Sequence, residues 1–272
     1  MTLPVIKIEA ETLPEVWEQA VLSVWENGMR IRTEYDREGD PESRDSTMIM
    51  AVKKPWAEPR IHRAFPGGLE SLEIYRQEVV EGIHDHWISP EEGKWTYTYH
   101  KRLFSYEMEG ERINQIDAAA KKMASVPFSR RAQAITWNPK LDRASDDPPC
   151  LQRIWFRISE DKTGRKYLNM NSHWRSRDAF KASFMNMYAL TDLQRCIAEK
   201  ISVLRNETVN PGSYVDISDS FHIYGSYYRE FEGFKETVQT RGFDKKTWTT
   251  EFAEPFFAEA RKAIESEKEN NR

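Results

Sequence analysis

The chain has 272 residues, of which 39 % are hydrophobic and 31 % are charged, and its formal net charge is −4. This composition excludes a disordered chain and gives enough length to bury a hydrophobic core. The acidic balance excludes a general binder of polyanions such as DNA, so any bound phosphate requires a local arginine cluster.

Hydrophobic spacing predicts alternating helices and strands in the first half of the chain. In chain order these are a helix over 12–28, a charged loop over 34–46, a strand over 47–54, a helix over 69–82, an aromatic strand over 95–106 and a helix over 112–124. The first helix begins with a capping Thr12 and an early proline and ends at Gly28.

The second half continues this mixed order. It contains predicted strands over 130–137, 153–159 and 165–173, a long amphipathic helix from Phe180 to Leu204, strands over 212–218 and 220–225, and a charged closing helix over 254–272. No repeat or low-complexity linker interrupts the order. We therefore predict a single α+β domain over residues 1–272, with a mixed β-sheet packed by helices.

Two features bear on the compartment. The chain has only two cysteines, which is too few for a disulfide framework and favours a reducing environment. Residues 1–20 lack the pattern of a signal peptide, and no apolar run approaches the about 18 residues of a membrane span. We expect a cytoplasmic protein without a membrane partner.

The segment DDPPCLQ, residues 146–152, places Cys150 directly after two prolines. Free cysteines are usually buried and inert, but two fixed φ angles would hold this thiol on a stiff turn. The sequence leaves both interpretations open, a core thiol or a displayed nucleophile. Cys196, beside Ile197 on the apolar side of the long helix, is expected to serve packing alone.

Arginines lie near several predicted element boundaries. They occur in the segments ESRDS (42–46), SRRA (129–132) and WRSRDAF (174–180), as Arg44, Arg130, Arg131 and Arg175, the last followed by Ser176. Such arginines are often only solvated surface charges. If these four met at the thiol, however, they would form a phosphate site and would lower the thiol pKa.

Three polar residues have two readings each. Asn186 falls among apolar positions of the long helix, where its amide needs partners, either backbone groups or the edge of a base. His222 and Tyr224 are two apart and share a strand face, which is either a half-buried aromatic face or a pair of contacts to a sugar hydroxyl.

His84 and His86 lack a matching second ligand cluster. Because a metal site needs three or four convergent ligands, we expect a solvated turn at these histidines and no metal.

In their order, the arginine loop, SRRA, PPC, RSRDAF followed by Asn186, and HIY resemble the thymidylate synthase and pyrimidine nucleotide hydroxymethylase family, over roughly residues 40–225. The resemblance implies an α+β homodimer packed sheet to sheet, in which each active site borrows two arginines from the other subunit. It also implies a pyrimidine nucleotide monophosphate as substrate and 5,10-methylene-tetrahydrofolate or a related tetrahydropterin as cofactor.

The resemblance further implies roles for individual residues. These are Cys150 as nucleophile; Arg44, Arg175 and Ser176, with Arg130 and Arg131 of the other subunit, at the phosphate; Asn186 at the pyrimidine edge; His222 and Tyr224 at the sugar; Asp178 in ordering the folate and ring contacts; Tyr99 near the proton abstraction; and Glu73 or Glu78 as the catalytic glutamate.

The implied chemistry begins with addition of the Cys150 thiolate to C6 of the pyrimidine, which makes C5 a carbon nucleophile. C5 attacks the one-carbon unit, a base removes the C5 proton and the pterin leaves. Hydride from the pterin then gives a methyl group, whereas water gives a hydroxymethyl group. The resemblance pairs asparagine with uracil and aspartate with cytosine, so Asn186 favours dUMP, and an amide can indeed serve both O4 and N3–H.

The sequence also departs from the common synthases. Leu151 stands where they have histidine, Trp174 where they have glutamine and Ala182 where they have glycine, and the chain ends in EKENNR, which is no apolar tail. These changes favour the archaeal-type synthases or a hydroxymethylase acting on dUMP, dCMP or CMP. A relative that only binds nucleotides is the third reading, against which the retained Cys150 weighs.

Overall fold

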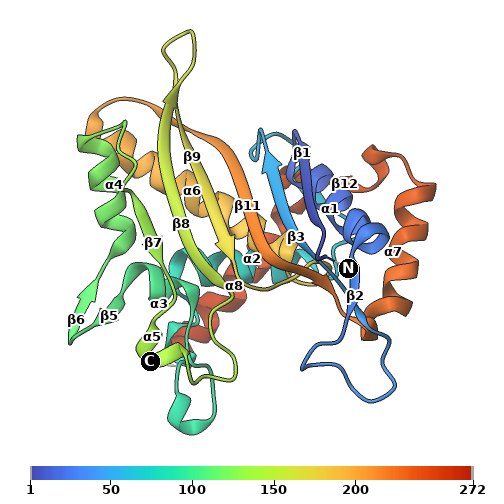
Figure 1. Ribbon diagram of the computed structural model, residues 1–272. Coiled ribbons are helices and arrows are strands. Elements are labelled where there is room, and N and C mark those ends of the chain that lie inside the picture. Colours follow the sequence, from blue (N-terminus) through green and yellow to red (C-terminus); the bar gives the residue numbers. More distant parts are fainter. Residues whose placement is uncertain (1, 271–272) are drawn as a thin grey trace.

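The computed structural model describes residues 2–270 and is built around an eight-stranded sheet (Figure 1). Its main strands, in spatial order, are β1 (Val5–Ala10), β3 (Ser43–Val52), β11 (Val209–Ile223), β9 (Lys166–Trp174), β8 (Leu151–Glu160) and β7 (Gln133–Ile135), while β2 (Met29–Ile31) pairs with β3 and β10 (Arg177–Asp178) with β11. Strands β1 and β3 are parallel, as are β11 and β9, whereas the other neighbours on this path are antiparallel.

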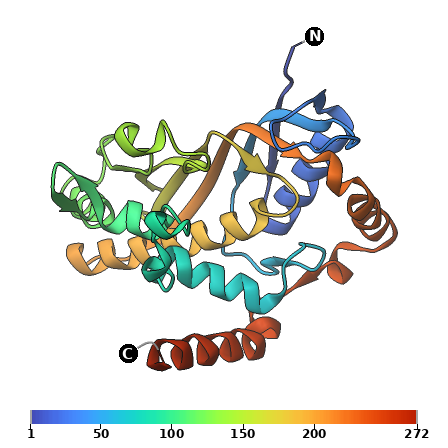
Figure 2. The same cartoon turned by 90° about the horizontal axis from the view of Figure 1, so that it is seen from below.

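Helices cover one face of this sheet in successive layers. Helices α1 (Leu13–Asn27) and α6 (Ser183–Arg205) contact the strands, α2 (Leu69–Glu81) packs on α6, and α8 (Thr250–Asn270) packs on α2. Figure 2 shows α8 as the outermost layer. The α+β class with a mixed sheet packed by helices is therefore confirmed.

Shorter elements surround this centre. They are α3 (Tyr99–Phe104), α4 (Gln115–Ser125), α5 (Pro139–Asp142) and α7 (Tyr228–Thr240), with the strand pairs β4 (Ile61–His62) and β12 (Thr247–Trp248), and β5 (Tyr106–Met108) and β6 (Glu111–Ile113). Single 3-10 turns span Asp85–Trp87, Pro90–Glu92, Gly225–Tyr227 and Phe243–Lys245. Within residues 2–270, no helix has the length and apolarity that crossing a membrane requires.

Helix α1 shows how the sequence pattern produces the layers. The backbone N–H of Thr12 donates to the Glu15 carboxylate at 2.9 Å, which caps the first turn as predicted. The apolar side chains at helical spacing, including the fully buried Trp17, face the sheet. The Trp17 indole also donates to the carbonyl of Ala179 at 3.0 Å, so this buried polar group is satisfied.

The aromatic segment 95–106 differs from its prediction. It does not form one strand, because its centre is helix α3 and β5 begins only at Tyr106. Thr98 caps α3, since its hydroxyl accepts from the Lys101 N–H at 3.0 Å. Local capping and packing thus override the strand propensity of the aromatic residues.

Most other predicted elements are confirmed, with shifted ends. The strands predicted over 212–218 and 220–225 are one strand, β11, with an irregular register between Ser218 and Phe221. The closing helix is present as α8, and its predicted last residues, 271–272, lie outside the described part. The short β1 and helix α7 were not predicted.

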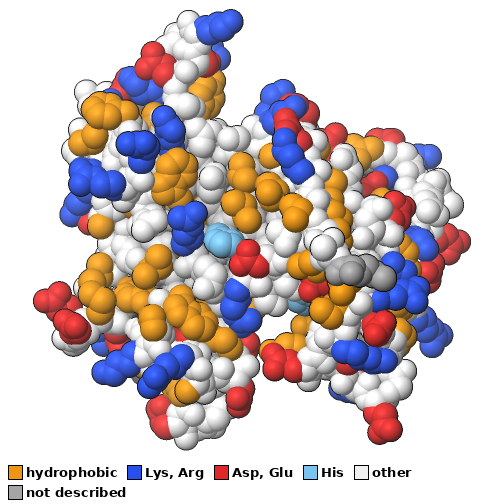
Figure 3. All heavy atoms as spheres, in the orientation of Figure 1, with side chains coloured by type: hydrophobic (Ala, Val, Ile, Leu, Met, Phe, Trp, Pro, Cys, Tyr) orange, Lys and Arg blue, Asp and Glu red, His pale blue; other side chains and the backbone are white. Residues whose placement is uncertain are grey.

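The second face of the sheet carries no helix in the part of the chain that the structure describes (Figure 1). Along β8, buried residues alternate with outward Arg153, Trp155 and Arg157. Figure 3 shows this face, where hydrophobic side chains lie over the strands between groups of Lys and Arg. A sheet face of this kind, half apolar and partly basic, is suited to contact another surface.

Candidate active site

Cys150 lies on a turn that is fixed from two sides, directly before β8. The Arg175 N–H donates to the Cys150 carbonyl at 2.9 Å, and the Arg175 guanidinium donates to the carbonyls of Pro148 at 2.6 Å and Pro149 at 3.2 Å. The Gln152 amide also donates to the Pro149 carbonyl at 2.8 Å. The proline turn therefore does hold Cys150 in a defined place.

Cys150 is half-buried and packs against the hydrophobic core, so it is neither fully buried nor freely exposed. Burial raises the pKa of Cys150, Arg175 and Arg177 lower it, and Asp147 raises it. The two arginines favour the thiolate in a setting that otherwise opposes it. Cys196 is also half-buried, and it accepts from Arg195 at 3.6 Å rather than lying in the core.

A pocket of about 430 Å³ opens beside this turn. Its lining comprises Glu78, Gly93, Lys94, Trp95, Thr96, Tyr97, Thr98, Tyr99 and Asp147. The Tyr99 hydroxyl accepts from the N–H of Leu151 at 3.3 Å, which joins the pocket wall to the residue after Cys150. Burial raises the pKa of Tyr99, so its hydroxyl is protonated and can also donate.

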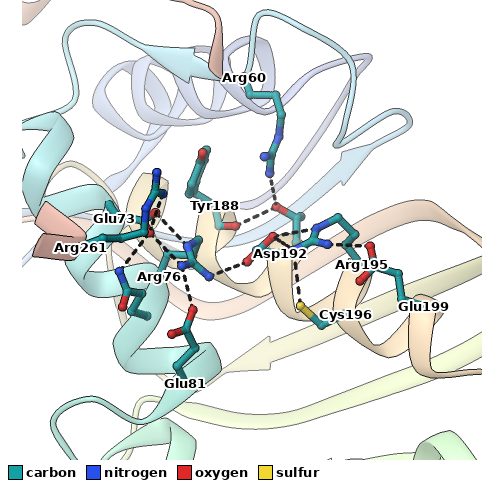
Figure 4. Close-up of polar contacts among 12 residues, drawn as sticks. Arg60, Glu73, Arg76, Glu81, Tyr188, Asp192, Arg195, Cys196, Glu199 and Arg261 are labelled. Carbon is teal, nitrogen blue, oxygen red and sulfur yellow. Dashed lines mark hydrogen bonds and ion pairs between the residues drawn. The ribbon is translucent and has the colours of Figure 1, made fainter. Parts of the chain in front are cut away.

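The structure separates the two candidate glutamates, which lie on different sides of α2. Glu73 accepts from both Nε and Nη2 of Arg76 at 2.8 Å and from Arg261 of α8 at 3.3 Å, within the network of charged side chains in Figure 4. Glu78 instead lines the pocket, and its only side-chain partner in the described residues is His84, at 2.9 Å. Burial raises the pKa of Glu78 and the His84 hydrogen bond lowers it.

A second polar group lies where β10 meets β11. Asp178 pairs with His222 in the parallel register of the two strands, and the His222 ring lies edge-on to Tyr224 at 4.5 Å. Burial lowers the pKa of His222 to about 4, so the ring is neutral at pH 7. Its Nε2 is buried without a hydrogen-bond partner in residues 2–270, which leaves one polar atom for a ligand.

Asp178, the last residue of β10, also fixes the backbone that leads into α6. Its carboxylate accepts from the backbone N–H groups of Phe180 at 3.0 Å and Lys181 at 2.7 Å. Burial raises its pKa to about 6, and the backbone hydrogen bonds oppose this rise. Tyr35, from the charged loop over 34–46, approaches Tyr224 at 6.3 Å, so this loop lies beside the site.

Asn186 is buried on α6, as its spacing predicts, and only 9 % of it is exposed. Its amide does not bond to backbone, because Nδ2 donates to the hydroxyl of Tyr75 on α2. Tyr75 is half-buried, and Tyr99, Glu78 and Arg177 are the titratable groups that act on its hydroxyl. Through Tyr75, Asn186 is therefore connected to Tyr99 and Glu78, which both line the pocket.

The predicted arginine cluster is only partly assembled within one chain. Arg175 lies at the Cys150 turn, and the half-buried Ser176 follows it. Arg130 and Arg131, at the start of β7, are exposed, and neither forms an ion pair within the described part of the chain. They remain available to a second molecule.

Arg44 is not brought to the other arginines. It pairs with Ile223 in the antiparallel register, whereas the neighbouring Asp45 pairs with His222, so Arg44 and His222 point to opposite faces of the sheet. The Arg44 guanidinium lies over the Trp25 ring at 4.8 Å. Its place on the helix-covered face does not support the phosphate role that the resemblance implies.

Sequence reasoning missed Arg177 and Tyr75. Arg177 is 2 % exposed, pairs with the buried Asp216 and lies over the Trp174 ring at 3.9 Å. Trp174 in turn meets Tyr99 edge-on at 5.8 Å. Arg177 lies in the RSRDAF segment, but only the fold shows that a charge there is buried, because Asp216 is 39 residues away.

No group of three or more His, Cys, Asp or Glu side chains within residues 2–270 is arranged to hold a metal ion. The two histidines that prompted the question have other surroundings. His84 bonds to Glu78, and its ring stacks on Trp87 at 3.6 Å, while the His86 ring lies 6.0 Å from Trp87.

Comparisons with known proteins found matches both in sequence and in structure. The family model described as thymidylate synthase matches residues 67–248. A Methanocaldococcus jannaschii protein named "Putative thymidylate synthase" is 30 % identical over 84 % of this chain and 94 % of its own length. A protein of the same name from Methanosarcina mazei is 27 % identical over 80 % of this chain and 88 % of its own length.

Among solved structures, the chain resembles the thermostable thymidylate synthase A from Bacillus subtilis, with a TM-score of 0.62 and 18 % identity. The match covers 85 % of this chain and 86 % of that one. At this identity the likeness establishes the fold alone.

Proposed function

The chain belongs to the thymidylate synthase family, whose members are methyltransferases, and on this premise we propose that it converts dUMP to dTMP. The one-carbon unit would come from 5,10-methylene-tetrahydrofolate or a related tetrahydropterin. The observation that carries the proposal is the fixed turn of Cys150, next to Arg175 and to a pocket lined by Tyr99 and Glu78. Binding of a nucleotide alone would require neither the thiol nor a half-buried carboxylate in the adjoining pocket.

In this proposal the Cys150 thiolate adds to C6 of the uracil ring, and Arg175 favours its ionised form. Asn186 reads the pyrimidine edge, since one N–H of its amide donates to Tyr75 and the second N–H and the oxygen are left for O4 and N3–H. His222 and Tyr224 are proposed to contact the sugar hydroxyl. Asp178 is proposed to order the cofactor and the contacts to the pyrimidine ring.

Glu78 and Tyr99 are the proposed proton-handling groups. Burial raises the pKa of Glu78, which makes its carboxylate a stronger base, and the Tyr99 hydroxyl can donate or accept a hydrogen bond next to Leu151. Both line one pocket, so they can act on the same ring.

The pocket also fits a flat cofactor. Trp95 lines it, is 40 % exposed and meets Trp87 edge-on at 5.1 Å, so an aromatic surface adjoins the carboxylate. Such a surface suits the face of a pterin. When bound, the methylene-tetrahydropterin supplies the one-carbon unit and, for a methyl product, the hydride.

We further propose a homodimer that forms through the uncovered face of the sheet. The outward Trp155, the 39 % exposed Ile135 of β7 and the unpaired Arg130 and Arg131 all favour contact with a second copy. The two arginines would then complete the phosphate site of the other subunit. We also propose that the protein is cytoplasmic, because its two cysteines are free and free thiols persist in a reducing compartment.

The test of this function is the product mass after incubation with methylene-tetrahydrofolate and, separately, dUMP, dCMP, UMP or CMP. We expect a methyl group added to dUMP. A hydroxymethyl group would instead identify a hydroxymethylase and its substrate. No product, together with tight nucleotide binding and no release of tritium from C5, would contradict catalysis by this pocket with this cofactor.

Exchanging each candidate glutamate separates their roles. Glu78→Gln is expected to lower kcat by a factor on the order of 10²–10⁴, because it removes the base from the pocket. Glu73→Gln is expected to leave kcat within about threefold but to lower the free energy of unfolding by about 1–3 kcal/mol, since it weakens the hydrogen bonds to two arginines. Turnover assays and urea unfolding of both variants check this, and the opposite pattern would assign the base to Glu73.

Asn186→Asp tests the base reading. An ionised aspartate cannot donate to O4 of uracil but can accept from the exocyclic amine of cytosine. The ratio of kcat/KM for dUMP to that for dCMP is expected to fall about 10- to 100-fold. Asn186→Ala, which loses both contacts, should lower kcat/KM for dUMP without raising that for dCMP. An unchanged ratio in the aspartate variant would rule out the role of Asn186 at the base edge.

A further inference from the structure

His84 contacts the candidate base Glu78 and does not itself line the pocket. Its Nδ1 lies 2.9 Å from the Glu78 carboxylate, and the residue is 7 % exposed. The two residues are six apart in sequence, and the end of α2 lies between them. The contact therefore depends on how the chain turns after the helix.

Gly82 makes that turn possible. It ends α2 with φ of +68°, in the left-handed region that favours glycine. A Cβ at this position would also lie only 2.2 Å from the ring of His100. The chain can thus reverse tightly here, and His84, two residues on, returns to Glu78 on the last turns of the helix.

An aromatic platform fixes the His84 ring. The ring stacks on Trp87 with 3.6 Å between centroids and an angle of 13°, and Trp95 meets it edge-on at 6.0 Å. Stacking restricts rotation of the imidazole, and the hydrogen bond to a carboxylate selects the tautomer with a proton on Nδ1. His84 is therefore set to donate to one oxygen of Glu78.

The surroundings of Glu78 offer no other strong donor. Asp85, next to His84, disfavours the ionised carboxylate. The hydroxyl of Tyr75 on α2 accepts from Asn186 and forms no hydrogen bond to Glu78 in the described residues. From the other elements, Lys94, Tyr97, Tyr99 and Asp147 line the same pocket without a hydrogen bond to Glu78 in the described residues. His84 is the group that favours the carboxylate in this buried place.

We propose that His84 is a positioning residue, which donates its Nδ1–H to Glu78 and holds that carboxylate ionised and aimed into the pocket. The proposal rests on the proposed function only for the role of Glu78, because the pair itself is a feature of the fold. It assigns a task in the reaction to a histidine that sequence reasoning left in a solvated turn.

Two variants test it. His84→Phe keeps a flat ring on Trp87 but lacks the donor, and His84→Asn keeps an N–H near the Nδ1 position but lacks the ring. With His84→Phe we expect kcat to fall about 10- to 100-fold, KM for dUMP to stay within about twofold, and the acidic limb of the kcat–pH profile to move to higher pH. In His84→Asn, by contrast, we expect kcat and the position of the acidic limb to stay close to those of the wild type.

The direction of the pH effect follows from the hydrogen bond. It stabilises the ionised carboxylate and lowers the pKa of Glu78, so its loss lets burial raise that pKa further. A merely structural role would reduce turnover without moving the limb. In a Glu78→Gln background, His84→Phe should cause little further loss, and an equal loss in both backgrounds would contradict the proposal.

The titration of Glu78 gives a readout that does not depend on activity. We would follow the carboxyl ¹³C signal of Glu78 by NMR in the whole protein, assigned with Glu78→Gln, and compare wild type with His84→Phe. Titration at higher pH in the variant is expected, and titration at an unchanged pH overturns the inference. If the titration moves but the wild type forms no product from dUMP, the proposed function fails while the positioning role of His84 on Glu78 stands.

Discussion

Cys150→Ser is expected to lower turnover of dUMP by a factor on the order of 10⁴ or more, while the Kd for dUMP stays within about threefold. A serine hydroxyl in the same place ionises far less readily than a thiol, and Arg175 cannot offset that difference. Nucleotide affinity should persist because the polar groups proposed to hold the phosphate, base and sugar are untouched. Calorimetric titration measures the Kd for dUMP, and a turnover assay measures the rate.

The second cysteine provides the control. Cys196 lies on α6 beside Arg195, in the charged network of Figure 4, and it is no part of the proposed site. Cys196→Ser should leave both turnover and binding nearly unchanged. If Cys150→Ser instead abolished dUMP binding and lowered the unfolding temperature, Cys150 would be a structural thiol and the covalent mechanism would be wrong.

The family and fold class could be predicted because their signals are local. Each motif, such as the proline turn at Cys150 or the RSRDAF segment, is a short run whose order along the chain carries the resemblance, and the comparisons confirm it. The α+β class follows in the same way from periodicities within single elements. Neither prediction needs to know which elements become neighbours.

The parts that the sequence could not decide depend on contacts between distant segments. Arg44 lies one residue from Asp45, and this single step in strand register moves it to the opposite face of the sheet from His222. Glu73 and Glu78 share one helix, and only the packing of α8 on α2, through Arg261, shows which of them is already engaged. The partnership of His84 with Glu78 likewise depends on the turn at Gly82.

Two of the residues that differ from the common synthases, Trp174 and Leu151, have defined contacts in the structure. Trp174, which stands in place of glutamine, is buried and lies between Arg177 and Tyr99. It therefore links a buried ion pair to a wall of the pocket. Leu151 carries no polar side chain next to the thiol, but its backbone N–H donates to Tyr99 at 3.3 Å. The backbone of Leu151 thus supplies a polar contact to the pocket wall that its side chain does not.

Mixing two inactive proteins is expected to restore activity, which is the second large effect. Cys150→Ser lacks the nucleophile, and Arg130→Ala lacks an arginine that is exposed and unpaired within residues 2–270. If Arg130 serves the other subunit, a mixed dimer holds one site with both changes and one site with neither. Random pairing at equal amounts then gives about a quarter of the wild-type activity.

The measurement is turnover of dUMP after the two variants are unfolded together and refolded, which allows the subunits to exchange. Each variant refolded alone should stay below about one per cent of wild type, since each of its sites lacks one group. Arg130→Ala mixed with Arg131→Ala is the matched control: because one subunit donates both arginines to a site, each site of their mixed dimer still lacks one arginine, and no activity should return. Sites that use Arg130 of their own chain would give no recovery in the first mixture, since every site would still lack one of the two groups.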